Sequence, residues 1–184
     1  AVVTAKTSSS GTFYLQLDDK TTLRPQNITK SPFGKKEVRA LVNYTDKGAC
    51  ADNSDNTVKL DRNAEISWID SIRTKDIVPT AGAEDDKKYG TAAIEVINNW
   101  ITVVEDGYLT LCFCGEWGQS SRVHYINLVS GTDPDDPYVL ELRHDSNGDN
   151  LDMGYRRLTG LVAFNIKSLP DTKGKTVKLK IKYR

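Results

Sequence analysis

Apolar and polar residues alternate with a period of two along most of this 184-residue chain. Successive side chains of a β-strand point to opposite faces, so this period is typical of strands that bury one face. The alternation begins over residues 13–17 and is still present at the C-terminal end, over residues 177–183. Val, Ile and Thr, which favour strands, supply 14, 11 and 17 residues. We therefore predict an all-β protein.

Loops rich in Asp, Asn, Gly and Pro separate the predicted strands into two groups. About five short strands fall within the first 80 residues, and closing them into a small barrel would leave no exposed sheet edges. Residues 79–90 (PTAGAEDDKKYG) lack apolar periodicity and are interpreted as a linker. Six or seven strands follow, which predicts an antiparallel β-sandwich.

The resulting domain prediction is a barrel over residues 1–85 and a sandwich over residues 86–184. Residues 7–11 (TSSSG) read as a flexible tether near the N-terminus. Residues 92–100 are the one stretch that could be helical. Its β-branched Ile94, Val96 and Ile97, followed by two asparagines, favour a strand that ends at a turn.

Charge and composition exclude several classes of protein. The chain has 25 basic and 25 acidic residues, so its formal net charge is zero. A dedicated nucleic-acid binder would show a basic excess, and we predict no nucleic-acid partner and no cofactor. No apolar run approaches the roughly 20 residues that a membrane-spanning helix needs. The first residues, AVVTAK, lack an initiator Met and a signal-peptide core, so we expect processing or removal of a leader.

Cysteine usage does not suggest a disulfide framework. The chain has three cysteines, Cys50, Cys112 and Cys114. Cys112 and Cys114 are two residues apart in a predicted strand, where the extended backbone holds them at the outer limit for a disulfide. No further Cys or His cluster completes a zinc site. We interpret the three thiols as small buried side chains in the sheets.

Histidine-based catalysis would have to use His124 or His144, because the chain has two histidines. His124 could neighbour Ser120 or Ser121, as a nucleophilic triad requires. Each histidine is more simply interpreted as a partly buried side chain satisfied by a neighbour. Carboxylates of the second half, as in residues 133–136, could form a glycosidase pair, but they are expected to be solvated in turns. The prediction is a protein that is not an enzyme.

One acidic segment resembles the start of a calcium-binding loop. Asp145, Asn147 and Asp149 match its ligand positions 1, 3 and 5. Position 6 is Asn150 rather than Gly, and position 12 is Arg156 rather than Glu. A hairpin loop whose Asx side chains bond to their own backbone explains the same composition. We therefore predict no metal site; the three residues are the candidates if one is present.

Two further features could mediate binding. Trp117 lies in a turn-like segment, GEWG, where it could stack on a sugar or anchor a protein partner. It could equally fold back over the end of the sandwich, and it is the one candidate residue for ligand binding. Residues 178–184 place basic side chains on one face of the last strand. They could meet phosphate, or they could simply prevent edge-to-edge aggregation.

Several blocks, in order, resemble the NigD-like lipoproteins of Bacteroidetes. The blocks are residues 100–101, 107–111, 124–129, 138–145, 147–149, 162–166 and 177–183. The resemblance implies a small OB-like N-terminal barrel, a C-terminal β-sandwich and a lipid-modified cysteine after a removed signal peptide. It also implies an association with bacteriocin immunity through a gene neighbourhood, and it supplies no catalytic residues.

These observations together predict a non-catalytic, lipid-anchored protein of the outer membrane that acts as a binding module. Its partner would be an unknown envelope protein or a glycan, and it would touch the membrane only through the N-terminal lipid. The alternatives are a bacteriocin immunity protein and a carbohydrate-binding or carbohydrate-active envelope protein.

Overall fold

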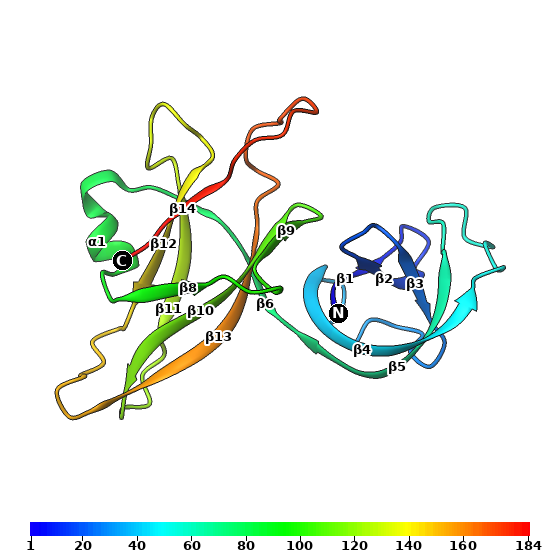
Figure 1. Cartoon of the computed structure of the whole chain (residues 1–184), viewed down its shortest axis with the longest axis horizontal. Helices are drawn as coiled ribbons and strands as arrows, with labels where there is room; N and C mark the ends of the chain where they lie inside the picture. Colours follow the sequence, from blue (N-terminus) through cyan, green and yellow to red (C-terminus); the bar gives the residue numbers. More distant parts are fainter. The chain divides into compact units, whose positions relative to one another are not determined.

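The computed structural model describes all 184 residues and divides them into two compact units, residues 1–74 and 75–184 (Figure 1). Both units are built from β-strands, and the one α-helix is five residues long. The all-β prediction, with a small barrel followed by a sandwich, is confirmed. No helix is long and apolar enough to cross a membrane.

The first unit is a closed five-stranded barrel in the order β1-β2-β3-β5-β4. Its pairs are antiparallel except for β3 with β5. The alternating apolar residues point inward, and Leu15, Leu23 and Ala40 are almost fully buried. Register shifts in the pairing of β4 with β5 interrupt the ladder, and such irregularities bend a strand enough to close a barrel. The strands are β1 (Val2–Thr7), β2 (Phe13–Leu17), β3 (Thr22–Pro25), β4 (Val38–Ala49) and β5 (Arg62–Ser71).

A buried charge lies on the barrel wall, at a position that the alternation assigns to the polar face. Arg39 of β4 has no exposed surface. Its guanidinium donates to the Thr4 hydroxyl at 3.0 Å and to the Asp18 carboxylate at 2.8 Å. A buried charge is tolerated when it is paired and hydrogen-bonded, so these contacts join β1 to β4 and to the residue that follows β2.

The second unit consists of two packed sheets whose facing side chains form one apolar core. One sheet has the order β6-β13-β10-β8, with β9 pairing beside β10, and the other has the order β14-β12-β11-β7. Leu128, Leu140 and Phe164 are fully buried in this core. The first sheet comprises β6 (Arg73–Asp76), β8 (Ile94–Ile97), β9 (Val103–Glu105), β10 (Tyr108–Gly118) and β13 (Tyr155–Asn165). The second comprises β7 (Val78–Pro79), β11 (Tyr125–Ser130), β12 (Val139–Asp145) and β14 (Lys180–Lys182).

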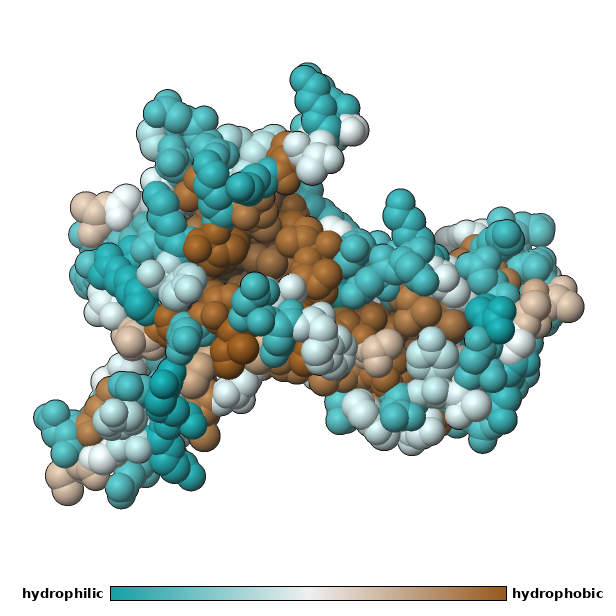
Figure 2. Space-filling model, in the orientation of Figure 1, coloured by the Kyte–Doolittle hydropathy of each residue, from teal (hydrophilic) through white to brown (hydrophobic).

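Both edges of the second sheet are parallel, although the sandwich was expected to be antiparallel throughout. The short strands β7 and β14 pair in parallel with β11 and β12, respectively. Partly buried apolar side chains in and beside β14, including Leu179 and Ile181, pack against the edge of this core. Figure 2 shows the apolar residues of this unit reaching its surface on the face in view. The strand predicted within residues 92–100 is confirmed as β8.

Residues 79–90 are folded, which corrects their interpretation as a linker. They contain η1 (Gly82–Glu84) and α1 (Asp85–Tyr89). The buried Asp85 carboxylate accepts hydrogen bonds from Thr80 and from the amide of Ala81. The Tyr89 hydroxyl donates to the Pro79 carbonyl at 2.7 Å. The two units meet between residues 74 and 75, whereas the sequence places the domain boundary at residue 85.

All three cysteines are free thiols. Cys50 and Cys112 are buried, and Cys114 is half-buried. Cys112 and Cys114 both lie on β10 between β13 and β8, and neither pairs with another cysteine in the two ladders.

The boundary can be tested with two fragments of the chain. We expect residues 75–184 to fold cooperatively when expressed alone, because this fragment keeps β7, Ile77 and the Asp85 contacts. Residues 86–184 lack these contacts, so the parallel edge and the α1 packing are lost and the fragment should aggregate or unfold. Circular dichroism with thermal melting compares the two. Equal stability of both fragments would contradict the boundary at residue 74.

Candidate functional site

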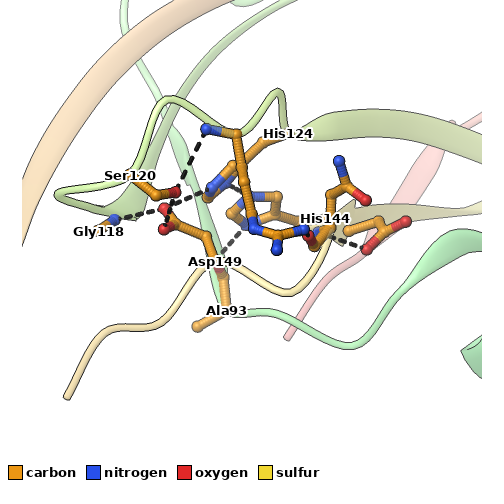
Figure 3. Close-up of polar contacts among 9 residues, drawn as sticks. Ala93, Gly118, Ser120, His124, His144 and Asp149 are labelled. Atoms are coloured by element: carbon orange, nitrogen blue, oxygen red, sulfur yellow. Dashed lines mark hydrogen bonds and ion pairs between the residues drawn. The ribbon is translucent and has the colours of Figure 1, made fainter.

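The richest polar cluster lies at one end of the second unit, where two loops meet. His124 ends the loop of residues 119–124 that joins β10 to β11, and His144 belongs to β12. Asp149 lies in the loop of residues 146–154 that joins β12 to β13. The three side chains are almost fully buried. Figure 3 shows them pointing toward one another from these separate segments.

Hydrogen bonds link these three side chains in series. His124 Nε2 lies 2.9 Å from Asp149 Oδ2, and His124 Nδ1 lies 2.7 Å from His144 Nε2. His144 Nδ1 then lies 2.9 Å from the carbonyl oxygen of Ala93. The Asp149 carboxylate also accepts bonds from the Ser120 hydroxyl and from the Gly118 amide, the latter at 2.6 Å.

These contacts fix the charge of the carboxylate. Hydrogen bonds from Ser120, together with those from His124 and the Gly118 amide, lower the pKa of Asp149 to about 2. Asp149 is thus ionised at neutral pH, since hydrogen bonds to the charged form of a carboxylate favour that form. Burial lowers the pKa of His144, with the nearby His124 adding to the shift and the Ala93 carbonyl opposing it.

The direction of each bond fixes where the protons are. The Ala93 carbonyl can only accept, so His144 Nδ1 carries a proton. The ionised Asp149 also only accepts, so His124 Nε2 carries one as well. The contact between His124 Nδ1 and His144 Nε2 needs one ring to donate and the other to accept. Burial disfavours positive charge on His144.

Trp117 of β10 completes the cluster from the apolar side. Its indole stacks on the His124 ring, with centroids 4.7 Å apart and planes at 14°, and also lies 5.2 Å from the His144 ring. Gly115 makes room for it, because a Cβ at this position would come within 2.7 Å of the indole. The candidate ligand-binding Trp117 therefore folds back over the end of the sandwich and is half-buried.

The three candidate metal ligands do not converge. The Asp145 carboxylate accepts a hydrogen bond from the backbone amide of Asn147 at 2.8 Å, in an Asx turn. The Asp149 carboxylate faces Gly118, Ser120 and His124 instead. No group of three or more His, Cys, Asp or Glu side chains is arranged to hold a metal ion.

The order of contacts differs from that of a nucleophilic triad. In such a triad the nucleophile donates to a histidine base, which a carboxylate orients. Here the exposed Ser120 donates to the carboxylate, and both nitrogens of His124 are occupied by Asp149 and His144. This arrangement ties loops together, and it offers no free imidazole nitrogen as a base.

The loops that this network ties together hold each other in place and carry exposed apolar side chains. The Gln119 amide donates to the Met153 carbonyl at 3.1 Å, and the Arg122 guanidinium donates to the Asn147 carbonyl at 3.1 Å. The exposed apolar side chains in these loops and at the adjoining strand ends are Val123, Tyr125, Met153 and Tyr155. We call these four residues the loop patch.

The other basic and acidic candidates from the sequence lie elsewhere. Lys180 pairs with Asp136 at 3.0 Å and Arg184 pairs with Asp86 at 3.2 Å, so half of the predicted basic face is neutralised. Sequence reasoning considered the two histidines separately. The sequence carries no signal for their mutual contact, because His124 ends the loop before β11, whereas His144 lies on β12, 20 residues further along the chain.

Both units match known family descriptions. Residues 2–72 match the NigD-like N-terminal OB domain, and residues 76–184 match the NigD-like C-terminal beta sandwich domain. The chain belongs to the NigD-like family. The resemblance that the sequence blocks carry is therefore confirmed, and the two matched ranges agree with the structural units.

Solved structures show the same fold over nearly the whole chain of this NigD-like protein. A candidate toxin-related protein from Parabacteroides distasonis is 36% identical, with a TM-score of 0.73, and the match covers 98% of this chain and 85% of that chain. A NigD-like immunity protein from Bacteroides caccae is 20% identical, with a TM-score of 0.62 and coverages of 99% and 84%. A candidate lipoprotein from Bacteroides fragilis is 15% identical, with a TM-score of 0.56 and coverages of 91% and 77%. The last two show the fold alone. No curated protein matches the chain.

Replacing the central carboxylate tests the network. Asp149→Asn removes the anion opposite His124, so we expect a lower thermal midpoint and faster hydrogen exchange at the Gly118 amide. Asp152→Asn is the matched control, because its side chain is exposed in the same loop. Equal exchange rates at Gly118 in the two variants would contradict the role given to Asp149.

The buried histidine also predicts a dependence on acid. Because the pKa of His144 is lowered from 6.5 in the folded state, the unfolded chain binds more protons just below that pH. Stability should therefore be complete with respect to His144 above pH 6.5 and should fall as the pH drops toward 5. Thermal melts of the wild type and His144→Gln measure this. At pH 6.5 the variant should have a lower thermal midpoint than the wild type. Its midpoint should change much less than that of the wild type between pH 6.5 and 5. An equal change of midpoint with pH in both proteins would contradict the role of His144.

Proposed function

We propose that this NigD-like protein is a non-catalytic binding module of the cell envelope that is held to the membrane by an N-terminal lipid. The likeness to a protein described as a candidate lipoprotein supports an envelope role. The proposal assigns recognition to the loop patch, and the partner is another envelope protein.

The observation that carries the proposal is the combination of exposed apolar side chains with a rigid support. Met153 is 76% exposed, Val123 63% and Tyr155 55%. Side chains of this kind are favoured at protein interfaces, and single hydrophobic residues on a surface are otherwise unremarkable. Here four of them belong to two segments that are joined by buried hydrogen bonds through Asp149 and His124.

Rigid support matters because ordering a loop on binding reduces affinity. A loop that is already held in its binding conformation avoids that entropic cost. Asp149 connects both loops, and the Gln119–Met153 contact holds the exposed tip. The loops are thus prepared to meet a partner without rearrangement.

A second candidate function is immunity to a bacteriocin. It is favoured by the likeness to a protein described as NigD-like immunity protein and to one described as toxin-related. In this reading the loop patch would contact the toxin. Expression in a bacteriocin-sensitive strain separates the two functions: a gain in survival that depends on the loop patch supports immunity, and unchanged survival supports the general binding role.

The binding proposal predicts a partner that depends on the loop patch. The soluble chain is immobilised and exposed to detergent-solubilised Bacteroides envelope, and bound proteins are quantified. The double variant Met153→Ser/Tyr155→Ser should recover a partner about tenfold less well, since exposed anchors of this size often carry more than 1 kcal/mol.

Val104→Ser is the control for this experiment. Val104 is also exposed, but it lies on β9 at the other end of β10, so it should recover the partner as the wild type does. Equal recovery by all three proteins would contradict the role of the loop patch. Turnover of a glycan by the purified chain would contradict the non-catalytic proposal.

A further inference from the structure

The barrel has two adjoining hollows beside the turn between β1 and β2. Each encloses about 500 Å³, and both are lined by Gly11 and Phe13. The first continues along Arg24 and Gln26, and the second continues along Lys30 and its neighbours. Since they share two lining residues, we treat them as one cleft and call it the barrel cleft.

The barrel cleft is lined by positive charge without any carboxylate. Its charged lining residues are Arg24, Lys30 and Lys35, and no Asp or Glu lines either hollow. Residues 24–36 contain four basic residues and no acidic one, in a chain whose net charge is zero. Arg24 is paired with Asp52 at 2.6 Å, whereas Lys30 and Lys35 form no ion pair and are exposed.

Neutral hydrogen-bonding groups lie between these charges. Thr12, Thr29, Ser31 and Gln26, which carry hydroxyl and amide groups, are among the lining residues. Hydroxyl and amide groups can both donate and accept, as the hydroxyls of a sugar ring also do. The lining therefore suits a ligand that alternates hydroxyl groups with negative charges.

The wall of the cleft is fixed before any ligand binds. The Ser8 hydroxyl donates to the Asp55 carboxylate at 2.6 Å, and the Ser10 hydroxyl lies 3.3 Å from the Thr57 hydroxyl. These contacts hold the β1–β2 turn against the loop that joins β4 to β5. Asp55 is turned to these hydroxyls and lines the adjoining hollow on the other side of Thr12, rather than the barrel cleft itself.

We propose that the barrel cleft binds an acidic oligosaccharide, with Lys30 and Lys35 on its carboxylate groups and the cleft hydroxyls on its ring hydroxyls. Single-stranded nucleic acid fits less well, because its binders combine positive charge with aromatic side chains on which bases stack. Phe13 is only 4% exposed, and Phe33 packs against the barrel core. This site is separate from the loop patch and does not rest on the proposed function.

The probe for this site is an oligomer of galacturonic acid, titrated onto the full chain by calorimetry at low salt. The variant Lys30→Gln/Lys35→Gln should raise the dissociation constant by about tenfold or more, since charge-assisted hydrogen bonds are the stronger ones. Both lysines are exposed, so the thermal midpoint of this variant should match that of the wild type.

Lys178→Gln/Lys182→Gln is the matched control, because it removes the same charge from exposed residues of the other unit. It should bind the oligomer within about twofold of the wild type. An equal loss in both variants would overturn the site in favour of attraction to net charge. Absence of binding, or equal binding of a single-stranded DNA oligomer, would also overturn it.

The loop-patch variant Met153→Ser/Tyr155→Ser separates this inference from the proposed function. It should keep full affinity for the oligosaccharide, because none of its substituted residues lines the cleft. Loss of oligosaccharide binding in this variant would contradict the location of the site in the barrel.

Discussion

A single buried carboxylate organises the end of the sandwich. Asp149 contacts a backbone amide, a hydroxyl and an imidazole, all from the end of β10 and the loop that follows it, so it ties that segment to the loop of residues 146–154. A charge without partners would be costly in this environment. The loop of residues 146–154 can therefore be placed in one way only, with its carboxylate inside, and the exposed positions of Met153 and Tyr155 follow from that placement.

The barrel also contains a buried charge with hydrogen-bonding partners, but there the charge is positive. Arg39 is buried on the barrel wall and its guanidinium is satisfied by Thr4 and Asp18. Buried ion pairs add little to stability compared with apolar packing of the same volume, but breaking one leaves an unpaired charge. In each unit, therefore, a buried charge holds a segment against the strands: Arg39 holds the residue that follows β2, and Asp149 holds the loop of residues 146–154.

Sequence periodicity predicted the strands well, because burial of one face leaves a local signal. It predicted the barrel, the sandwich and the strand β8. It failed for residues 79–90, where a two-residue strand and a five-residue helix are too short to show a period, and their order depends on distant partners. The histidine pair was missed for a related reason. Alternation assigns His124 and His144 to faces, but only the pairing of β11 with β12 makes them neighbours.

The position of Trp117 gives the molecule an internal optical reporter. Its indole lies against both imidazoles of the histidine pair, whereas Trp68 is 49% and Trp100 is 67% exposed to solvent. A positively charged imidazole accepts an electron from an excited indole more readily than a neutral one does. The emission of one tryptophan of three is thus coupled to the protonation of His144, and the state of the buried network is visible in solution without any added label.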